Sequence, residues 1–234
     1  MGRASGIGEP SQVFGTGREG FTTRPVVTGR YGVVTAGHYL AAAAGMEILR
    51  AGGNAIDAGV AMGFCLAVLE PQSNGIGGES PILIHHARSG RTVAINGQGT
   101  APAAATIERF RSLGISLIPG DGLLAATVPS QVSNWLLALA EFGTLSLRQV
   151  LAPALDLARN GFGMYHGLRR CIAANEERYR EEWPGSAAVY LPEGRVPEWG
   201  DRFRNPQWAD TFELLARAEQ EAAGRGRAAG LDAA

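Results

Sequence analysis

The chain has 234 residues, a formal net charge of -1 and 45% apolar residues. This length can bury a sizeable core, and the apolar content excludes gross disorder. The near-zero charge argues against nucleic acid or an anionic membrane as the main partner. The sequence contains no lysine, which excludes chemistry by a Schiff-base or P-loop lysine of this chain.

The cysteines and the apolar segments bear on metal binding and on the cellular compartment of the protein. Cys65 and Cys171 lie far apart and no CxxC pair occurs, so the sequence predicts no structural zinc site. Residues 1–20 lack the apolar stretch of a secretory signal. The longest apolar run, residues 55–69, carries Asp57 and is too short to span a bilayer. We therefore predict a cytoplasmic protein that has no membrane segment.

The first part of the chain alternates between strand-like and helix-like patterns. Residues 1–24 are rich in Gly, Ser and Pro without periodicity and are predicted to be flexible. Residues 26–36 are rich in β-branched side chains and predict a strand. Residues 40–50 have helical spacing, and the glycines at 52 and 53 are expected to end that helix through positive φ angles.

A second helix is predicted over residues 55–70. Asn54 is a suitable N-cap, and Asp57 in the first turn suits the helix macrodipole, so we interpret Asp57 as a helix-start carboxylate and not as a catalytic one. Because the helix is apolar on nearly every face, it is expected to be buried. Residues 80–86 and 91–96 predict a β-hairpin.

The rest of the chain is predominantly helical in its patterning. The predicted elements are a helix over 106–111 capped by Thr106, a short strand near Thr127, helices over 130–142, 146–160, 167–182 and 206–223, an irregular stretch over 184–206, and the start of a further helix at 228. This order of elements predicts a mixed α/β layered fold, with one domain over residues 25–234.

Four separated motifs resemble one protein family. They are GGNAIDA (52–58), LEPQSNGIGG (69–78), TAPAAAT (100–106) and GTLSLRQVLAPALDLARNGF (143–162). In this order and spacing they resemble the γ-glutamyltranspeptidases, and the resemblance covers roughly residues 24–223. It implies the αββα four-layer sandwich of the N-terminal-nucleophile hydrolases, of which this chain carries an incomplete part.

The resemblance also implies a chemistry. Such an enzyme is a zymogen that cleaves itself into a large and a small subunit. The new N-terminal threonine of the small subunit then attacks the amide carbonyl of the acyl donor, with its own amine as base. No metal or organic cofactor is implied. We expect this threonine to lie beyond Ala234, so that this chain carries no catalytic residue and acts as the N-terminal part of a large subunit whose partner is the small subunit.

One position departs from the family pattern. The family places an arginine that grips the donor's α-carboxylate just before the Ala-Pro pair, and the aligned residue here is Gln98. A neutral amide cannot form the bidentate, charge-assisted pair that guanidinium forms with carboxylate. Gln98 is therefore our predicted substrate-binding residue, and we expect a donor other than glutathione.

Several functions stay open at this point. The first is a γ-glutamyltransferase-like enzyme acting on a small amide or peptide, and the second is an oxamate-type amidohydrolase or a β-lactam side-chain acylase. The third, from another class, is a non-catalytic truncated subunit that acts only by binding a small subunit.

Other candidate residues have a structural interpretation. The glycines of residues 74–78 predict a turn. His85 and His86 are neighbours on one strand, so they are expected to point to opposite faces, one buried and one exposed. His38, at the start of a helix, is expected to be a structural histidine. An aromatic cluster is predicted to form a satellite core and comprises Trp183, Tyr190, Trp199, Phe203 and Trp208.

Overall fold

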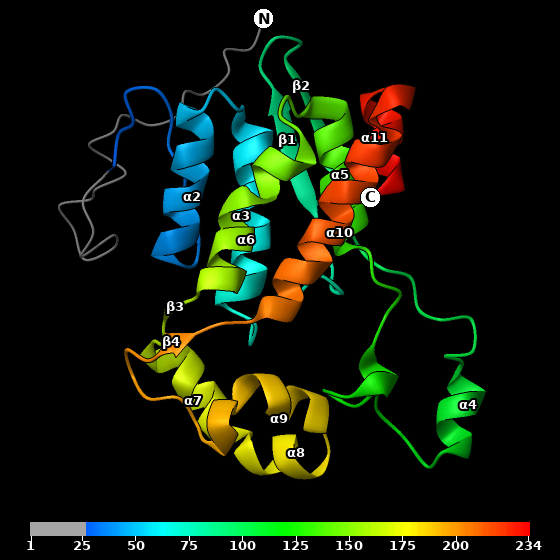
Figure 1. Ribbon diagram of the computed structural model, residues 1–234. Coiled ribbons are helices and arrows are strands. Elements are labelled where there is room, and N and C mark those ends of the chain that lie inside the picture. Colours follow the sequence, from blue (N-terminus) through cyan, green and yellow to red (C-terminus); the bar gives the residue numbers. More distant parts are fainter. Residues whose placement is uncertain (1–26) are drawn as a thin grey trace, which may run out of the picture. The chain divides into compact units, whose positions relative to one another are not determined.

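The computed structural model describes residues 27–234 (Figure 1). The predicted flexible segment, residues 1–24, lies outside the described residues. The chain divides into two units after Val33, and the helices and strands of the described residues belong to the second. The strand predicted over residues 26–36 is wrong for residues 27–36, because they form no regular structure and pair with no other segment of residues 27–234. No helix of the described part is long and apolar enough to cross a membrane.

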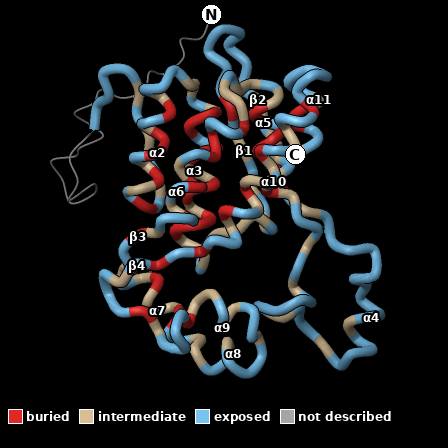
Figure 2. Tube along the Cα trace, viewed as in Figure 1, coloured by how far each residue is buried: buried red, intermediate tan, exposed pale blue. Residues whose placement is uncertain are grey.

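Helix α3 (Ala55–Leu69) is the centre of the fold, as its apolar sequence predicted. It packs against α2 (Tyr39–Arg50), α5 (Gln131–Phe142) and α6 (Leu147–Asn160). Figure 2 shows buried residues along these helices. Cys65 of α3 is fully buried, and burial, together with the Glu47 carboxylate, raises the pKa of its thiol to about 12.

Helix α10 (Pro206–Ala222) packs along α6, and α11 (Arg227–Ala233) packs on α10 and α5. A short 3₁₀ turn, η3 (Ala223–Arg225), joins the last two helices. Both helices begin where the sequence predicted, within one residue.

The start of α3 and the α5–α6 connection are held together by buried polar contacts. Asn54 and Asp57 form the capping box of α3, so Asp57 is a helix-start carboxylate, as predicted. Asp57 also accepts hydrogen bonds from the backbone amide and hydroxyl of Thr144 (2.9 and 2.6 Å) and from the Leu145 amide (3.2 Å). The Asn54 side chain donates to the Phe142 carbonyl (2.6 Å). We call this group of five residues the Asp57 hub.

The described residues form two small antiparallel sheets. The predicted hairpin is confirmed as β1 (Ile82–His86) and β2 (Arg91–Ile95), with Ile84 opposite Val93. Two short strands, β3 (Phe162–Gly163) and β4 (Arg202–Phe203), form the second sheet.

The histidines of β1 depart from the prediction. Both His85 and His86 are exposed, so the expectation of one buried ring is wrong. Ile84 is the only residue of β1 that is fully buried, because the end of the hairpin leaves the helical core before the histidines.

A group of short helices lies between β3 and β4. They are α7 (His166–Ala174), α8 (Glu176–Glu181), α9 (Pro184–Tyr190) and the 3₁₀ turn η2 (Pro192–Gly194). The single helix predicted over 167–182 is wrong because it breaks at Asn175, whose side chain donates to the Cys171 carbonyl (2.9 Å). The irregular stretch predicted over 184–206 is also wrong in part, because Pro184 starts α9, a position that proline favours.

Most of the aromatic cluster is packed, but it belongs to the main core and does not form the separate satellite core that was predicted. Tyr190 stacks on the buried Phe203 at 5.9 Å with an interplanar angle of 8°, and Trp208 packs on Phe212 at 5.4 Å. Trp199 is the exception, because it is 68% exposed and stacks only on His166.

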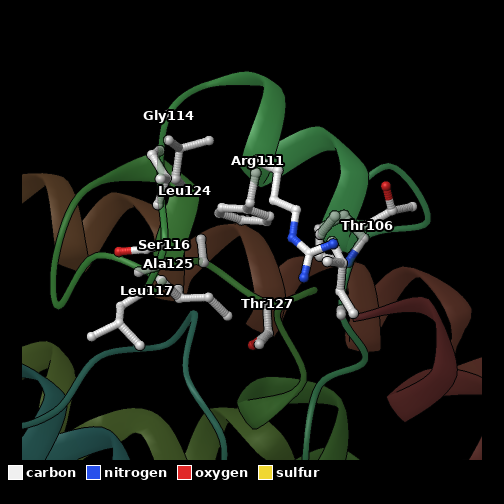
Figure 3. A pocket seen from close by; sticks show the side chains of 16 residues that line it. Thr106, Arg111, Gly114, Ser116, Leu117, Leu124, Ala125 and Thr127 are labelled. Atoms are coloured by element: carbon white, nitrogen blue, oxygen red, sulfur yellow. The ribbon is translucent and has the colours of Figure 1, made fainter.

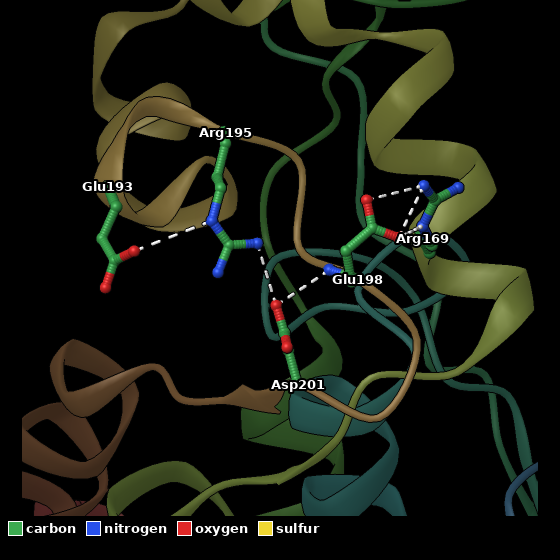
Figure 4. A network of polar contacts seen from close by, with 5 residues as sticks. All are labelled: Arg169, Glu193, Arg195, Glu198 and Asp201. Atoms are coloured by element: carbon green, nitrogen blue, oxygen red, sulfur yellow. Dashed lines mark hydrogen bonds and ion pairs between the residues drawn. The ribbon is translucent and has the colours of Figure 1, made fainter.

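Ion pairs fasten the loop that follows η2. Arg195 bonds Asp201 (2.9 Å) and lies 3.7 Å from Glu193 (Figure 4). Asp201 also accepts from the Glu198 amide, and the Glu198 carboxylate pairs with Arg169 of α7 (2.9 Å). These contacts hold residues 193–201 in place, directly before β4.

Residues 101–127 form an excursion that we call the arm. It contains α4 (Ile107–Ser112), which is capped by Thr106 as predicted, and the 3₁₀ turn η1 (Leu123–Ala125). No residue from 98 to 130 is fully buried, and the arm is exposed along its length in Figure 2. The predicted strand near Thr127 is absent, because a single bond from the Val128 amide to the Thr100 carbonyl (2.9 Å) replaces a ladder.

Candidate functional site

Two glycine-containing segments meet at the start of α5. The Gly78 carbonyl accepts from the amides of Ser130 and Gln131 (3.3 and 3.0 Å). The Gly97 carbonyl accepts from the Ser80 amide and from the Ser130 hydroxyl (both 2.9 Å). Ser130 therefore uses its hydroxyl to join the segments and makes no side-chain cap bond to α5. This junction is the framework of the candidate site.

Gln98, the predicted substrate-binding residue, lies between two constrained glycines of this junction. Gly97 has a φ of 61°, and a side chain there would collide with the Ser80 carbonyl. A side chain at Gly99 would collide with the Val128 carbonyl. The backbone on both sides of Gln98 is thus fixed, whereas its side chain is exposed.

Residues 71–78, which we call the glycine loop, provide most of the lining of a cavity of about 330 Å³, which we call the loop cavity. The lining comes from the loop together with Glu79 and Gln131. Gln131 is buried, and its side-chain oxygen lies where a side chain at Gly78 would be in tight contact. Gln98 does not line this cavity.

A separate groove of about 480 Å³ lies between α5 and α11 and is lined by residues such as Leu136, Leu137 and Leu231. The loop cavity, unlike this groove, adjoins the junction, because Gly78 and Gln131 line it.

The glycine loop is held at its start by a tyrosine. The Tyr165 hydroxyl donates to the Leu69 carbonyl (3.0 Å) and accepts from the Gln72 side chain (3.0 Å). The Ser73 and Asn74 amides both bond the Glu70 carbonyl (2.9 Å), so the hydrogen-bonded turn lies at residues 70–74, before the glycines where it was predicted. Residues 76–78 form only a bend, and none of the glycines of 74–78 has a positive φ. Burial raises the pKa of Tyr165, which therefore remains a neutral donor at physiological pH.

His38 lies beside this tyrosine, and its ring centroid is 5.1 Å from that of Tyr165. Its Nδ1 accepts from the Leu40 amide (3.2 Å), which caps α2. Burial lowers the pKa of His38, although the nearby Glu70 carboxylate acts in the opposite direction. His38 is therefore a neutral, structural histidine, as the sequence analysis expected.

The described residues lack an activated nucleophile. Two histidines of the hairpin do approach hydroxyl groups, since His85 lies 3.1 Å from Thr92 and His86 lies 2.8 Å from Ser89. Both pairs are exposed. Nucleophilic catalysis requires a third group that orients the base, and no such group bonds either histidine ring within residues 27–234. Within residues 27–234, no group of three His, Cys, Asp or Glu side chains could hold a metal ion.

Sequence reasoning missed Gln131 and Tyr165. Gln131 reaches the loop cavity from a segment more than fifty positions along the chain, and Tyr165 reaches the glycine loop from nearly a hundred. No local pattern identifies either residue, because its role depends on tertiary contacts alone. Together these polar groups can orient a small polar ligand, but they cannot cleave it.

Comparison with known proteins adds the wider context. The sequence model of γ-glutamyltranspeptidase matches residues 41–231. The glutathione hydrolase-like YwrD proenzyme of Bacillus subtilis (strain 168) is 38% identical over 197 residues, which are 84% of this chain and 37% of that protein. The acylase ACY 1 proenzyme of Pseudomonas sp. (strain V22) is 41% identical over 206 residues, with 83% and 36% covered.

A solved structure agrees with these relatives. The γ-glutamyltranspeptidase of Helicobacter pylori has 32% identity and a TM-score of 0.76, and the match covers 86% of this chain and 57% of that one. The described fold is accordingly a fragment of the N-terminal-nucleophile hydrolase fold. The chain spans little more than a third of the length of the curated relatives it matches. It belongs to the γ-glutamyltranspeptidase family.

Proposed function

We propose that this chain is the N-terminal part of the large subunit of an amidohydrolase or acyltransferase, and that Gln98 contacts the acyl donor. Family membership supports the class of reaction. The names of the two relatives, a glutathione hydrolase-like protein and an acylase, support a small amide as substrate. No cofactor takes part in this proposal.

The observation that carries the proposal is the fixed backbone around Gln98. Two glycines hold the chain at the junction, while the amide side chain remains free to meet a ligand. A residue presented in this way can orient a substrate at low entropic cost, because its backbone is already ordered.

The nucleophile is proposed to come from another part of the enzyme. An N-terminal threonine, released by self-cleavage on the small subunit, attacks the amide carbonyl and forms an acyl-enzyme. Water or an amine then resolves this intermediate, which gives hydrolysis or transfer. The exposed histidine–hydroxyl pairs of the hairpin have no part in this reaction.

Gln98 bears on the choice of donor. A γ-glutamyl donor carries an α-carboxylate, which guanidinium binds in a bidentate, charge-assisted way and a neutral amide does not. We therefore propose a donor other than a γ-glutamyl amide, either an oxamate-type amide, whose carboxylate is attached to the amide carbonyl itself, or the acyl side chain of a β-lactam. The similarity to an acylase favours the second of these.

The experiment measures kcat/KM of the complete enzyme, with the nucleophile-bearing part present, for two chromogenic donors. γ-Glutamyl and 4-aminobutanoyl anilides differ only in the α-carboxylate. The Gln98→Arg variant is expected to raise kcat/KM for the γ-glutamyl anilide by about tenfold to a hundredfold, the range that one charge-assisted hydrogen-bonded pair supplies. Activity on the 4-aminobutanoyl anilide is expected to stay the same or fall.

Gln207→Arg is the matched control, because it adds the same charge at an exposed position on α10. An equal rise with Gln207→Arg would mean that net charge, and not contact, governs the effect. Efficient turnover of the γ-glutamyl anilide by the unchanged enzyme would contradict the proposed donor. Absence of activity on every small amide would contradict the enzyme itself.

A further inference from the structure

The loop cavity contains a buried polar side chain that lacks a partner among the described residues. Gln131 lines the cavity and is only 7% exposed. Its backbone amide and carbonyl bond Gly78 and Ser80, but its side-chain carboxamide makes no hydrogen bond to any residue from 27 to 234. Because buried polar groups are nearly always hydrogen-bonded, this carboxamide offers a free donor and a free acceptor to an occupant of the cavity.

Glu79 gives the same cavity a negative charge. It is the charged residue among those that line the cavity, and the others with polar side chains, such as Ser73 and Asn74, are neutral. The Glu79 carboxylate belongs to none of the ion pairs within residues 27–234. An occupant therefore meets one carboxylate and several neutral oxygen atoms, a lining that attracts a cation and repels an anion.

Both ends of the glycine loop are fixed, so the cavity is formed before a ligand binds. At the start of the loop, the Tyr165 hydroxyl bonds the Leu69 carbonyl and the Gln72 side chain. At its end, the Gly78 carbonyl accepts two backbone amides at the start of α5. A ligand does not have to order this backbone, which lowers the entropic cost of binding.

The size and the lining of the loop cavity suit a primary ammonium group on a small molecule. Its volume of about 330 Å³ lies at the small end of the range for ligand sites. An ammonium group is purely a hydrogen-bond donor, and the carboxylate and amide oxygens of the lining are acceptors. A calcium ion would need about six to eight oxygen ligands, usually with several carboxylates, and the lining has a single carboxylate. An organic ammonium therefore fits better than a metal ion.

The hollow of the arm offers no such site, although its volume of about 600 Å³ is larger. Its lining is mainly apolar, with Phe110, Leu117 and Leu124 among its side chains, and none of the lining residues is fully buried. Figure 3 shows Arg111 reaching into it from α4, so its charged lining residue is itself a cation. The loop cavity differs in both charge and buried polar groups.

We propose that the loop cavity binds a small organic ligand that carries a primary ammonium group and no carboxylate. The ammonium group donates to the Glu79 carboxylate and to the side-chain oxygen of Gln131, and the neutral remainder of the ligand lies along the glycine loop. Gln98 does not line this cavity, so the site is separate from the proposed contact between Gln98 and the acyl donor. The inference goes beyond the proposed function, and binding at this site requires no turnover.

The test is a ligand-observed NMR titration of the complete enzyme, without an acyl donor, with glycinamide as the probe. The unchanged enzyme is expected to bind glycinamide. Glu79→Gln, which removes the charge and keeps the shape of the side chain, is expected to weaken binding by about tenfold, the loss of one charge-assisted hydrogen bond. Gln131→Leu is expected to weaken binding by about threefold, the loss of one neutral hydrogen bond, and to leave thermal unfolding unchanged.

Glu141→Gln is the matched control, since Glu141 is exposed near the other end of α5 and its substitution removes the same charge. This variant is expected to bind glycinamide as tightly as the unchanged enzyme does. The control ligand is N-acetylglycinamide, which lacks the ammonium group and is expected not to bind.

Several results would overturn the inference. Absence of glycinamide binding, or equal affinities of the Glu79→Gln and Glu141→Gln variants, would remove the site. Equal binding of N-acetylglycinamide would remove the role of the ammonium group. Binding of Nα-acetyl-lysinamide at least about tenfold tighter than glycinamide would make a lysine side chain of another polypeptide the occupant. Because no acyl donor is present, these results are independent of amide hydrolysis, which tests the proposed function separately.

Discussion

The Asp57 hub and the arm are both made of connecting segments, yet different forces hold them. In the hub, a fully buried carboxylate accepts hydrogen bonds from Asn54, Thr144 and Leu145, and Gly143 packs against it without a side chain. In the arm, no residue is fully buried, and an exposed ion pair joins the tip to α8.

This difference shows which of the two regions is stabilised by contacts within the chain alone. A buried polar group is stable only when its hydrogen bonds are satisfied within the fold. The hub meets this condition from residues of the chain alone. The arm instead leaves apolar side chains in water, which is a cost that a binding partner would remove.

Removing the carboxylate of the hub should have the largest effect. Asp57→Ala leaves the buried amides of Asn54, Thr144 and Leu145 without an acceptor, so we expect a loss of about 3–5 kcal/mol in the free energy of unfolding. Urea unfolding followed by circular dichroism measures this loss. Asp210→Ala, on the exposed side of α10, is the control and should change stability by at most about 0.5 kcal/mol. A comparable stability for both variants would mean that the hub is not a stabilising centre.

The same carboxylate should make stability depend on pH. Burial alone would raise the pKa of Asp57, but the hydrogen bonds from Thr144, Asn54 and Leu145 outweigh it and lower the pKa below its usual value. The stabilisation is therefore present above the pKa of the unfolded chain, about 3.9, and is lost as the pH falls through the folded pKa.

Asp57→Asn isolates this contribution from those of other acids. We expect the free energy of unfolding of the unchanged chain to exceed that of the variant by about 2 kcal/mol at neutral pH. This difference in stability should shrink as the pH falls below about 4. Urea unfolding at a series of pH values measures it. A difference that stays constant down to acidic pH would show that the charge of Asp57 does not contribute.

The hub could be predicted in part from the sequence, whereas in the arm only the helix capped by Thr106 could be. Asn54 and Asp57 follow the spacing of a capping box, so their local roles were readable. The bonds from Asp57 to Thr144 and Leu145 were not, because they join segments that are far apart in the chain. In the same way, the Gly-Gly break predicted the end of α2, although only Gly52 has a positive φ.

The candidate site shows the same division. Resemblance to the family identified Gln98, and the helix start at Ser130 was readable from its type, but the use of the Ser130 hydroxyl to bind Gly97 was not. The missed strand at residues 27–36 and the missed break at Asn175 have a related cause. Local preference predicted a regular element where tertiary pairing or a side-chain bond decided otherwise.

The smallest expected effect concerns the link between the arm and α8. Arg178 bonds Asp121 and lies 4.2 Å from the centre of the Trp183 ring. Because exposed ion pairs contribute little to global stability, Arg178→Ala should leave the urea midpoint unchanged. It should instead release the arm locally, so that trypsin cleaves after Arg109 and Arg111 roughly twofold faster. Mass spectrometry of the first fragments measures this rate.

Arg180→Ala is the matched control for this last experiment. Arg180 lies on the same helix and pairs with Glu176, and it does not contact the arm. It should leave cleavage in the arm at the rate of the unchanged chain. If both variants accelerate cleavage equally, the effect belongs to α8 and not to the Asp121 contact. If neither does, the arm is held by its base alone, and the contrast with the hub becomes sharper, because one backbone bond at Val128 would then be its main restraint.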